Sequence, residues 1–228
     1  MQDIGFDLNS MSFAVLFVAF ALGGVIKGAT GAGAPVIAIP VMALFFDVQL
    51  AVILMAIPNL ISNSVQIVHY RNENFSKVLV GRFAAFGALG CSLGTVILAF
   101  SPPNLLEVIV AVSTVSYIAL RIMNPKLELK EKISQKLSIP IGFAGGVIQG
   151  ASGISAPIAL SFLTAMKLKR EVFIFTISCF FGGMALVQIG ALSVFGLLKW
   201  PLILLSIMAL IPQIMFMPVG NLITKNMQ

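Results

Sequence analysis

Residues 23–35 read GGVIKGATGAGAP, and residues 145–157 read GGVIQGASGISAP. Nine of the 13 positions are identical at a constant offset of 122, and Thr30 and Ser152 form a conservative match. The same offset aligns Gln66 with Gln188, each inside the apolar stretch that follows. The chain is therefore an internal duplication. A duplicated hydrophobic chain with Gly and Pro interruptions at equivalent positions is typical of secondary transporters.

The composition around these two stretches is that of an integral membrane protein. Of the 228 residues, 59% are hydrophobic and 10% are charged, and the mean hydropathy is +1.05. Soluble domains average about 45–50% apolar and about 25% charged residues, so a soluble or disordered chain is excluded. Two cysteines without a regular spacing exclude a disulfide scaffold or a zinc cluster. The net charge of +6 indicates basic cytoplasmic loops rather than a nucleic-acid surface.

Nine apolar stretches follow one another and differ in length. Those long enough to cross about 30 Å of hydrocarbon are 50–68, 78–100, 105–122, 172–195 and 201–219. Those too short, or barely long enough, are 11–26, 35–46, 137–148 and 156–166, which form two pairs joined by the Gly-rich stretches.

We therefore expect an all-α integral membrane protein of two repeats. Residues 1–123 form the first repeat and residues 137–228 the second, and residues 124–136 form a basic cytoplasmic linker. Each repeat holds a Gly/Pro-broken helical hairpin and about three transmembrane helices. The last helix of the second repeat is absent or lies beyond the sequence given.

The distribution of Lys and Arg indicates how the repeats cross the membrane. If each broken pair is a hairpin and the N-terminus is outside, 11 of the 14 basic residues become cytoplasmic, in segments 69–77, 121–136, 167–171 and 220–228. If each pair crosses once, the last two segments fall outside, against the positive-inside rule. A hairpin plus three crossings is an odd number, so we expect the second repeat to be inverted.

The two Gly-rich joints form the candidate substrate site. Pro35 and Pro157 stand where a half-helix would start, and the free N–H groups at such a start bind anions. Lys27 lies well inside an apolar region, where a charge is by default a functional-site hypothesis; its repeat partner is Gln149. The other candidates at the joints are glycines that allow close approach of the backbone and hydroxyl donors: Gly28, Gly31, Gly33, Gly150, Gly153, Thr30, Ser152 and Ser155.

Each candidate also has a structural alternative. The glycines fit tight helix packing equally well, and Lys27 could snorkel to an interface. Asn59, Asn63 and Gln66 share one helical face and, like Gln188, either face a cavity or bond another helix. We favour the cavity for Gln66 and Gln188, because both repeats keep them.

The substrate is expected to be an anion, because no Asp or Glu lies in the middle of an apolar stretch. We expect the lipid bilayer and a small anion as partners, no nucleic acid, no cofactor or metal, and no enzymatic activity; a homo-oligomer stays open. A passive anion channel would use the same site. A membrane thiol–disulfide relay is disfavoured, because Cys91 and Cys179 are not repeat partners.

The duplicated pattern Gly-Gly-x-x-x-Gly-x-Thr/Ser-Gly-x-x-x-Pro, in two similar halves, resembles the TauE/SafE family of sulfite exporters. The likeness covers nearly the whole chain. It implies a multi-pass transporter of the bacterial inner membrane that exports sulfite or another sulfur-containing anion, such as an organosulfonate. It maps the family motifs onto Gly24, Gly28, Thr30, Gly31 and Pro35, and onto Gly146, Gly150, Ser152, Gly153 and Pro157.

Overall fold

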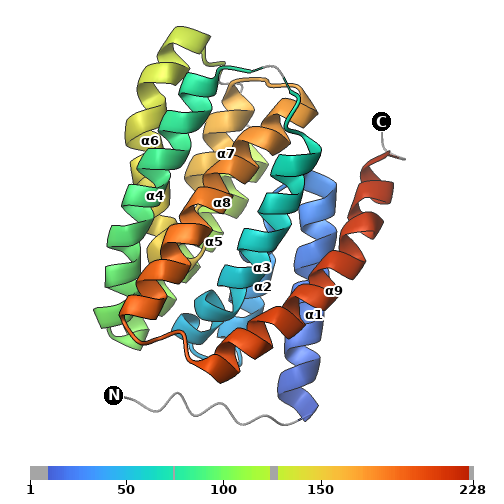
Figure 1. Ribbon diagram of the computed structural model, residues 1–228, viewed down its shortest axis with the longest axis vertical. Helices are drawn as coiled ribbons and strands as arrows, with labels where there is room; N and C mark the ends of the chain where they lie inside the picture. The colour runs from blue at the N-terminus through green and yellow to red at the C-terminus, as the bar shows by residue number, and fades with distance from the viewer. Residues whose placement is uncertain (1–9, 74, 124–127, 226–228) are drawn as a thin grey trace.

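The computed structural model describes residues 10–73, 75–123 and 128–225, except for the side chains at positions 121, 156 and 225. The described residues form nine helices and no strand (Figure 1). The helices are α1 (Ser10–Thr30), α2 (Ala34–Ala43), α3 (Val48–His69), α4 (Lys77–Phe100), α5 (Pro103–Met123), α6 (Glu131–Ser152), α7 (Ala156–Ala165), α8 (Arg170–Val194) and α9 (Trp200–Lys225). Six of them, α1, α3, α4, α5, α8 and α9, are long and apolar enough to cross a membrane. The chain is an all-α, multi-pass membrane protein.

The first helix of each Gly-broken pair is longer than its apolar stretch predicted. α1 has 21 residues and α6 has 22, whereas α2 and α7 have 10 each. α1 and α6 are therefore longer than their apolar stretches indicated, and of the two only α1 is among the described helices that are long and apolar enough to cross a membrane. Both continue through the Gly-rich sequence, because helical glycines there allow a neighbouring helix to approach closely.

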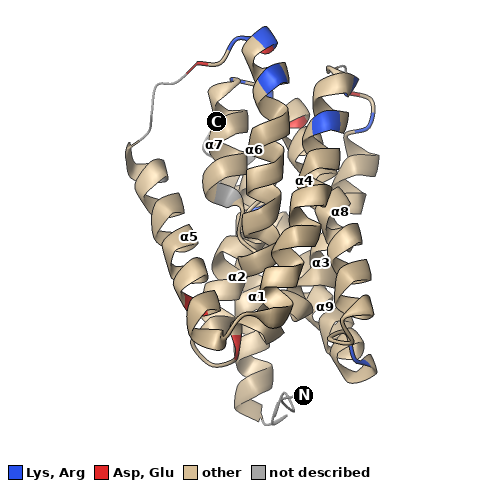
Figure 2. Ribbon diagram, turned by 90° about the vertical axis from the view of Figure 1, so that its left-hand side faces the viewer, with Lys and Arg blue, Asp and Glu red and all other residues tan. Residues whose placement is uncertain are grey.

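α1 and α6 run in opposite directions along the bundle (Figure 1). α1 rises from the lower end, where the α2–α3, α4–α5 and α8–α9 connections also lie. α6 descends from the upper end, where the loops after α3, α5 and α7 lie and where α9 ends. Lys and Arg gather at this upper end, called the basic end below (Figure 2). The described basic side chains there include Arg71, Lys77, Lys130, Lys132, Lys136, Lys167, Lys169 and Arg170.

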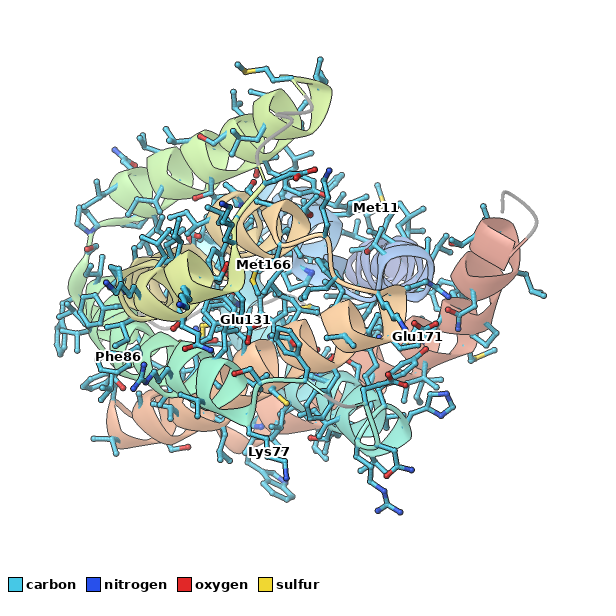
Figure 3. The ribbon with its side chains drawn as sticks, turned by 90° about the horizontal axis from the view of Figure 1, so that it is seen from above. Met11, Lys77, Phe86, Glu131, Met166 and Glu171 are labelled. Carbon is cyan, nitrogen blue, oxygen red and sulfur yellow. The ribbon has the colours of Figure 1, made fainter. Side chains whose placement is uncertain are left out.

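Helices of one half of the chain pack on helices of the other half. α1 packs along α9, α6 packs along α4, and α3 lies against α8. At the offset of 122, α1 corresponds to α6, α3 to α8, and α4 to α9. The offset therefore converts the α1–α9 pair into the α6–α4 pair. α5 lies on the periphery of the bundle when it is seen from the basic end (Figure 3).

Glycine allows close packing along the α1–α9 and α4–α6 contacts, here called seams. A Cβ added to Gly28 would overlap the backbone oxygen of Met217 in α9, and one added to Gly150 would overlap that of Cys91 in α4. Gly24 meets the backbone of Gln213 in the same way. Small residues at such seams are the usual means of packing helices in lipid, where apolar side chains gain little from leaving the solvent.

Side chains from neighbouring helices satisfy backbone carbonyls that the helices leave free. Pro58 lacks an N–H, so the carbonyl of Leu54 one turn earlier has no helical donor, and Ser206 of α9 donates to it at 2.7 Å. At the end of α1, Thr224 donates to the carbonyl of Ala29. Because lipid offers no hydrogen bonds, such contacts allow prolines and helix ends to lie at membrane depth.

Candidate substrate-binding site

The two Gly-rich joints fold into tips of the same shape. α1 and α6 each end at a glycine with positive φ, Gly31 at 77° and Gly153 at 72°, a conformation that favours glycine at a helix end. The N–H of Gly31 donates to the carbonyl of Lys27 at 2.8 Å, and that of Gly153 donates to the carbonyl of Gln149 at 2.7 Å. α2 and α7 begin a few residues later with Pro35 and Pro157 in their first turns, where the sequence predicted half-helix starts.

The hydroxyls of Thr30 and Ser152 hold the tips together. Thr30 Oγ1 donates to the carbonyl of Ile26 at 2.8 Å, accepts from the N–H of Ala32, and also contacts the carbonyl of Ala32. Ser152 Oγ donates to the carbonyl of Ile148 at 2.9 Å and accepts from the N–H of Ile154. Both hydroxyl protons are therefore used inside the turns in this state, and their predicted role as donors to a ligand stays a prediction.

The second tip carries a free hydroxyl at the start of α7. Ser155 is 1% exposed, and its Oγ has no hydrogen-bond partner among the described residues. Its backbone N–H donates to Oε1 of Gln149 at 3.0 Å. Gly33 takes the equivalent place in the first tip, with φ at 96°. The positive end of α7 thus meets a buried hydroxyl.

Lys27 is buried between α1 and α3 rather than directed to an interface. Its side chain is 1% exposed, and Nζ donates to Oδ1 of Asn63 at 2.7 Å. Nδ2 of Asn63 donates in turn to the backbone oxygen and to Oδ1 of Asn59, at 2.6 and 2.7 Å. Within the described part of the chain, the ion pairs include none to Lys27. A buried ammonium without a counter-charge is costly, and a bound anion would supply that charge.

Gln66 and Gln188 join helices to one another. Oε1 of Gln66 accepts from the hydroxyl of Ser178 at 3.0 Å, across the α3–α8 contact. Nε2 of Gln188 donates to the carbonyl of Gly150 at 3.3 Å, at the last turn of α6. These bonds follow the alternative in which the amides bond another helix, and contact of either amide with a substrate stays a prediction.

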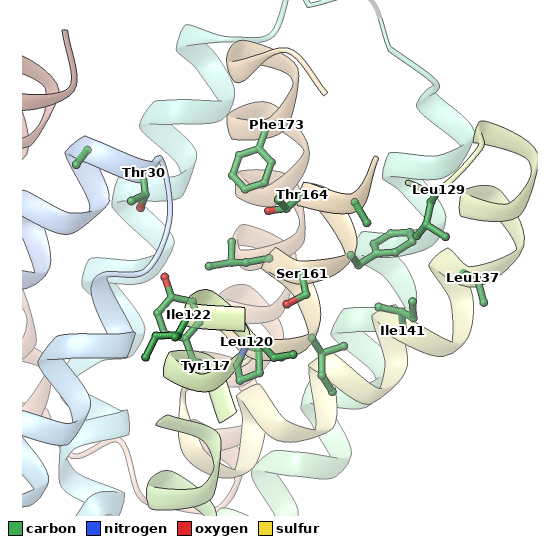
Figure 4. A pocket seen from close by; sticks show the side chains of 16 residues that line it. Thr30, Tyr117, Leu120, Ile122, Leu129, Leu137, Ile141, Ser161, Thr164 and Phe173 are labelled. Carbon is green, nitrogen blue, oxygen red and sulfur yellow. The ribbon is translucent and has the colours of Figure 1, made fainter. Parts of the chain in front are cut away.

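A pocket of about 1100 Å³ lies between the first tip, the start of α7 and the last turns of α5 (Figure 4). Its walls come from α5, α6, α7 and α8, and it touches Thr30 and Pro157. Four hydroxyl side chains line it among apolar ones, namely Thr30, Tyr117, Ser161 and Thr164. Among the described residues, none of those that line it is charged. The pocket therefore extends from the tips toward Leu129, which lies just before α6 at the basic end.

The family model for the sulfite exporter TauE/SafE matches residues 15–228. The chain belongs to the TauE/SafE family. No curated protein and no solved structure matches the chain. TauE/SafE proteins are membrane transporters, so the resemblance and the predicted class, a transporter of anions, are confirmed.

The two halves of this TauE/SafE protein differ in openness. At the offset of 122, the pocket residues Ser161, Thr164 and Phe173 correspond to Ile39, Met42 and Ala51. All three counterparts are fully buried in an apolar core that fills the lower half of the bundle. The half beside α7 is therefore open, while the equivalent half beside α2 is closed.

The sequence of this TauE/SafE protein did not indicate two polar residues that the structure places near the tips. Tyr117 on α5 lines the pocket, and Gln213 on α9 lies fully buried beside α1 and α3. Gln213 is a single amide in an apolar stretch, and this polar interruption could have marked it as a candidate site residue. Tyr117 had none, because its helix has no repeat counterpart in the sequence.

Proposed function

We propose that this TauE/SafE protein exports a small sulfur-containing anion, sulfite or an organosulfonate, across the bacterial inner membrane by alternating access. The observation that carries the proposal is Lys27, an ammonium 1% exposed whose described hydrogen bond goes to a neutral amide. A site with positive charge and no acidic side chain favours an anion over a cation. The pocket that leads to the tips gives such an anion a path from the basic end.

The two short helices support binding of the anion at the tips. α2 and α7 each begin at membrane depth with the positive end of the helix dipole. Pro35 and Pro157 have no N–H, and the N–H groups of Val36 and Ile158 already donate to the carbonyls of Gly33 and Ser155. The hydroxyl of Ser155, which has no partner among the described residues, can donate a hydrogen bond to a sulfur oxyanion held near these positive helix ends. In this proposal Lys27 supplies the full charge and the tips supply the hydrogen bonds.

The difference between the halves supports alternating access. An exporter needs one state open to the cytoplasm and another open to the outside, and two similar halves can exchange the open and closed forms. The half at Ser161 is open and its counterpart at Ile39 is closed, which favours a carrier over a continuous pore. In the other state we expect the half beside α2 to open.

The basic end is assigned to the cytoplasm on the positive-inside rule. This orientation leaves the N-terminus outside and makes the present state inward-open. Basic side chains around the entrance raise the local concentration of an anion before it binds. An inside-negative potential then favours its exit by about 2.3 kcal/mol per charge per 100 mV.

The test is transport of sulfite by the purified protein in proteoliposomes. Radiolabelled sulfite outside should accumulate transiently when the vesicles are preloaded with unlabelled sulfite, because a carrier exchanges substrate across the membrane. With the membrane potential held at zero by valinomycin and equal K⁺ on both sides, a passive channel would dissipate the gradient without this counterflow. Absence of any protein-dependent sulfite or sulfonate flux would contradict the proposed function.

A further inference from the structure

Gln213 is a buried amide whose carbonyl oxygen has no hydrogen-bond partner in the described part of the chain. The residue lies on α9, its side chain is fully buried, and Oε1 makes no hydrogen bond among the described residues. Nε2 donates to Oγ of Ser62 on α3 at 3.0 Å. A buried unpaired acceptor carries a large desolvation cost, so the position of this oxygen needs an explanation.

The hydrogen bonds around Ser62 fix which way the amide of Gln213 points. Oγ of Ser62 donates its one proton to the carbonyl of Pro58 at 2.6 Å, and so it can only accept from Gln213. Nε2 must therefore face Ser62, and the free atom is the carbonyl oxygen. The unpaired group is an acceptor and not a donor.

This oxygen belongs to the same three-helix junction as Lys27. Lys27 bonds Asn63, and Gln213 bonds the preceding residue of α3, Ser62. Gly24, one turn before Lys27 on α1, packs directly on the backbone of Gln213. The junction thus holds a cation with spare donor protons on α1 and a neutral acceptor on α9, linked through two consecutive residues of α3.

We propose that Gln213 is part of the anion site and that its Oε1 accepts a hydrogen bond from the substrate. The site then selects a monoanion with two kinds of group. Its oxygens accept hydrogen bonds from Lys27, and one N–H, O–H or S–H group donates to Gln213. Hydrogensulfite meets this requirement and the sulfite dianion does not. The inference rests on the proposed function, which it narrows to a protonated form of the substrate.

Few other groups in the junction change their charge with pH, so few could produce the same preference for a protonated ligand. Of the helices packed against Gln213, α1 carries Lys27 as its one charged residue. α3 carries His69 at its far end, where the side chain is exposed. A preference measured with ligands that keep their charge across the tested pH range therefore reports on Gln213 itself.

Sulfamate and methanesulfonate make the test sharp. They share a single negative charge and three sulfonate oxygens, and they differ in one amino group against one methyl group. Purified protein should bind sulfamate about three- to tenfold more tightly, the value of one hydrogen bond, in competition with labelled sulfite. In Gln213→Met, which keeps the side-chain length, the two ligands should bind equally, and methanesulfonate should bind as it does to the wild type.

Gln49→Met is the matched control, because Gln49 bonds the carbonyl of Leu98 far from the junction; it should keep the preference for sulfamate. Equal binding of the two ligands by the wild type would overturn the inference and mean that the carbonyl faces only water. A preference that persists in Gln213→Met would also overturn it. Failure of every ligand, sulfite included, would instead count against the proposed function.

Discussion

Nζ of Lys27 on α1 donates to Oδ1 of Asn63 on α3 at 2.7 Å. The pair is fully buried and joins a cation to a neutral amide rather than to a carboxylate. The amide satisfies one donor of the ammonium and leaves its charge uncompensated. The pair therefore joins α1 to α3 and leaves the positive charge of the ammonium available to bind an anion.

Asn63→Leu should destabilise the protein, because it leaves the ammonium of Lys27 without its acceptor. Loss of a hydrogen bond to a buried charge costs about 1.5–3 kcal/mol, seen as a lower midpoint of thermal unfolding in detergent. Lys27→Met in the same background removes the stranded charge and should recover most of the loss. If the two substitutions were simply additive, the bond between them would contribute nothing.

Gly28→Ala should weaken the seam between α1 and α9, because its Cβ would overlap the backbone of Met217. Overpacking of this kind costs about 1–3 kcal/mol. Gly190→Ala on α8 is the control, since an added Cβ there meets nothing within 4 Å; it should leave stability equal or higher, as Ala is the better helix former. Equal unfolding midpoints for both variants would contradict the packing account.

Ser161→Cys and Ile39→Cys test the open and closed halves directly. In a background in which Cys91 and Cys179 are replaced by Ala, a maleimide reagent should label position 161 many times faster than position 39. The reason is that Ser161 lines the pocket and Ile39 is fully buried. Similar labelling rates at the two positions would show that the halves do not differ in this way.

Ser206→Ala should cost about 0.6 kcal/mol, the average for a hydrogen bond between helices in a membrane. The cost should vanish when Pro58 is also replaced by Ala, because the restored N–H can then donate to the carbonyl of Leu54. Unfolding midpoints of the two single variants and the double variant measure this coupling. An equal cost of Ser206→Ala in both backgrounds would mean that the hydroxyl does not replace the missing N–H.

Much of the fold follows from the sequence, because lipid imposes simple rules. Apolar length predicted the long helices α3, α4, α5, α8 and α9, and the proline positions predicted where α2 and α7 begin. Apolar length underestimated α1 and α6, because both helices continue four residues beyond their apolar stretches into the Gly-rich joints, and α6 also begins six residues before its stretch. In a membrane such glycines sustain a helix by close packing, and hydropathy alone does not record this.

The site was predictable in its charge but not in its contacts. A lysine inside an apolar region indicated Lys27, and its burial in the structure agrees with a charge held at membrane depth. A sequence does not show where side chains point. The hydrogen bonds of Thr30 within its own turn and of Gln188 to the carbonyl of Gly150 are therefore visible only in the structure. The partner of Lys27 was one of three amides on a shared face.

The affinity of purified, folded Lys27→Met for sulfite is the decisive measurement for a buried ammonium that holds the substrate. We expect binding weaker by about 10- to 150-fold, the value of a charge-assisted hydrogen bond, in a variant that still unfolds cooperatively. Lys199→Met, which removes one positive charge at the opposite end of the bundle, should bind sulfite as the wild type does. Unchanged sulfite affinity in Lys27→Met would contradict the account.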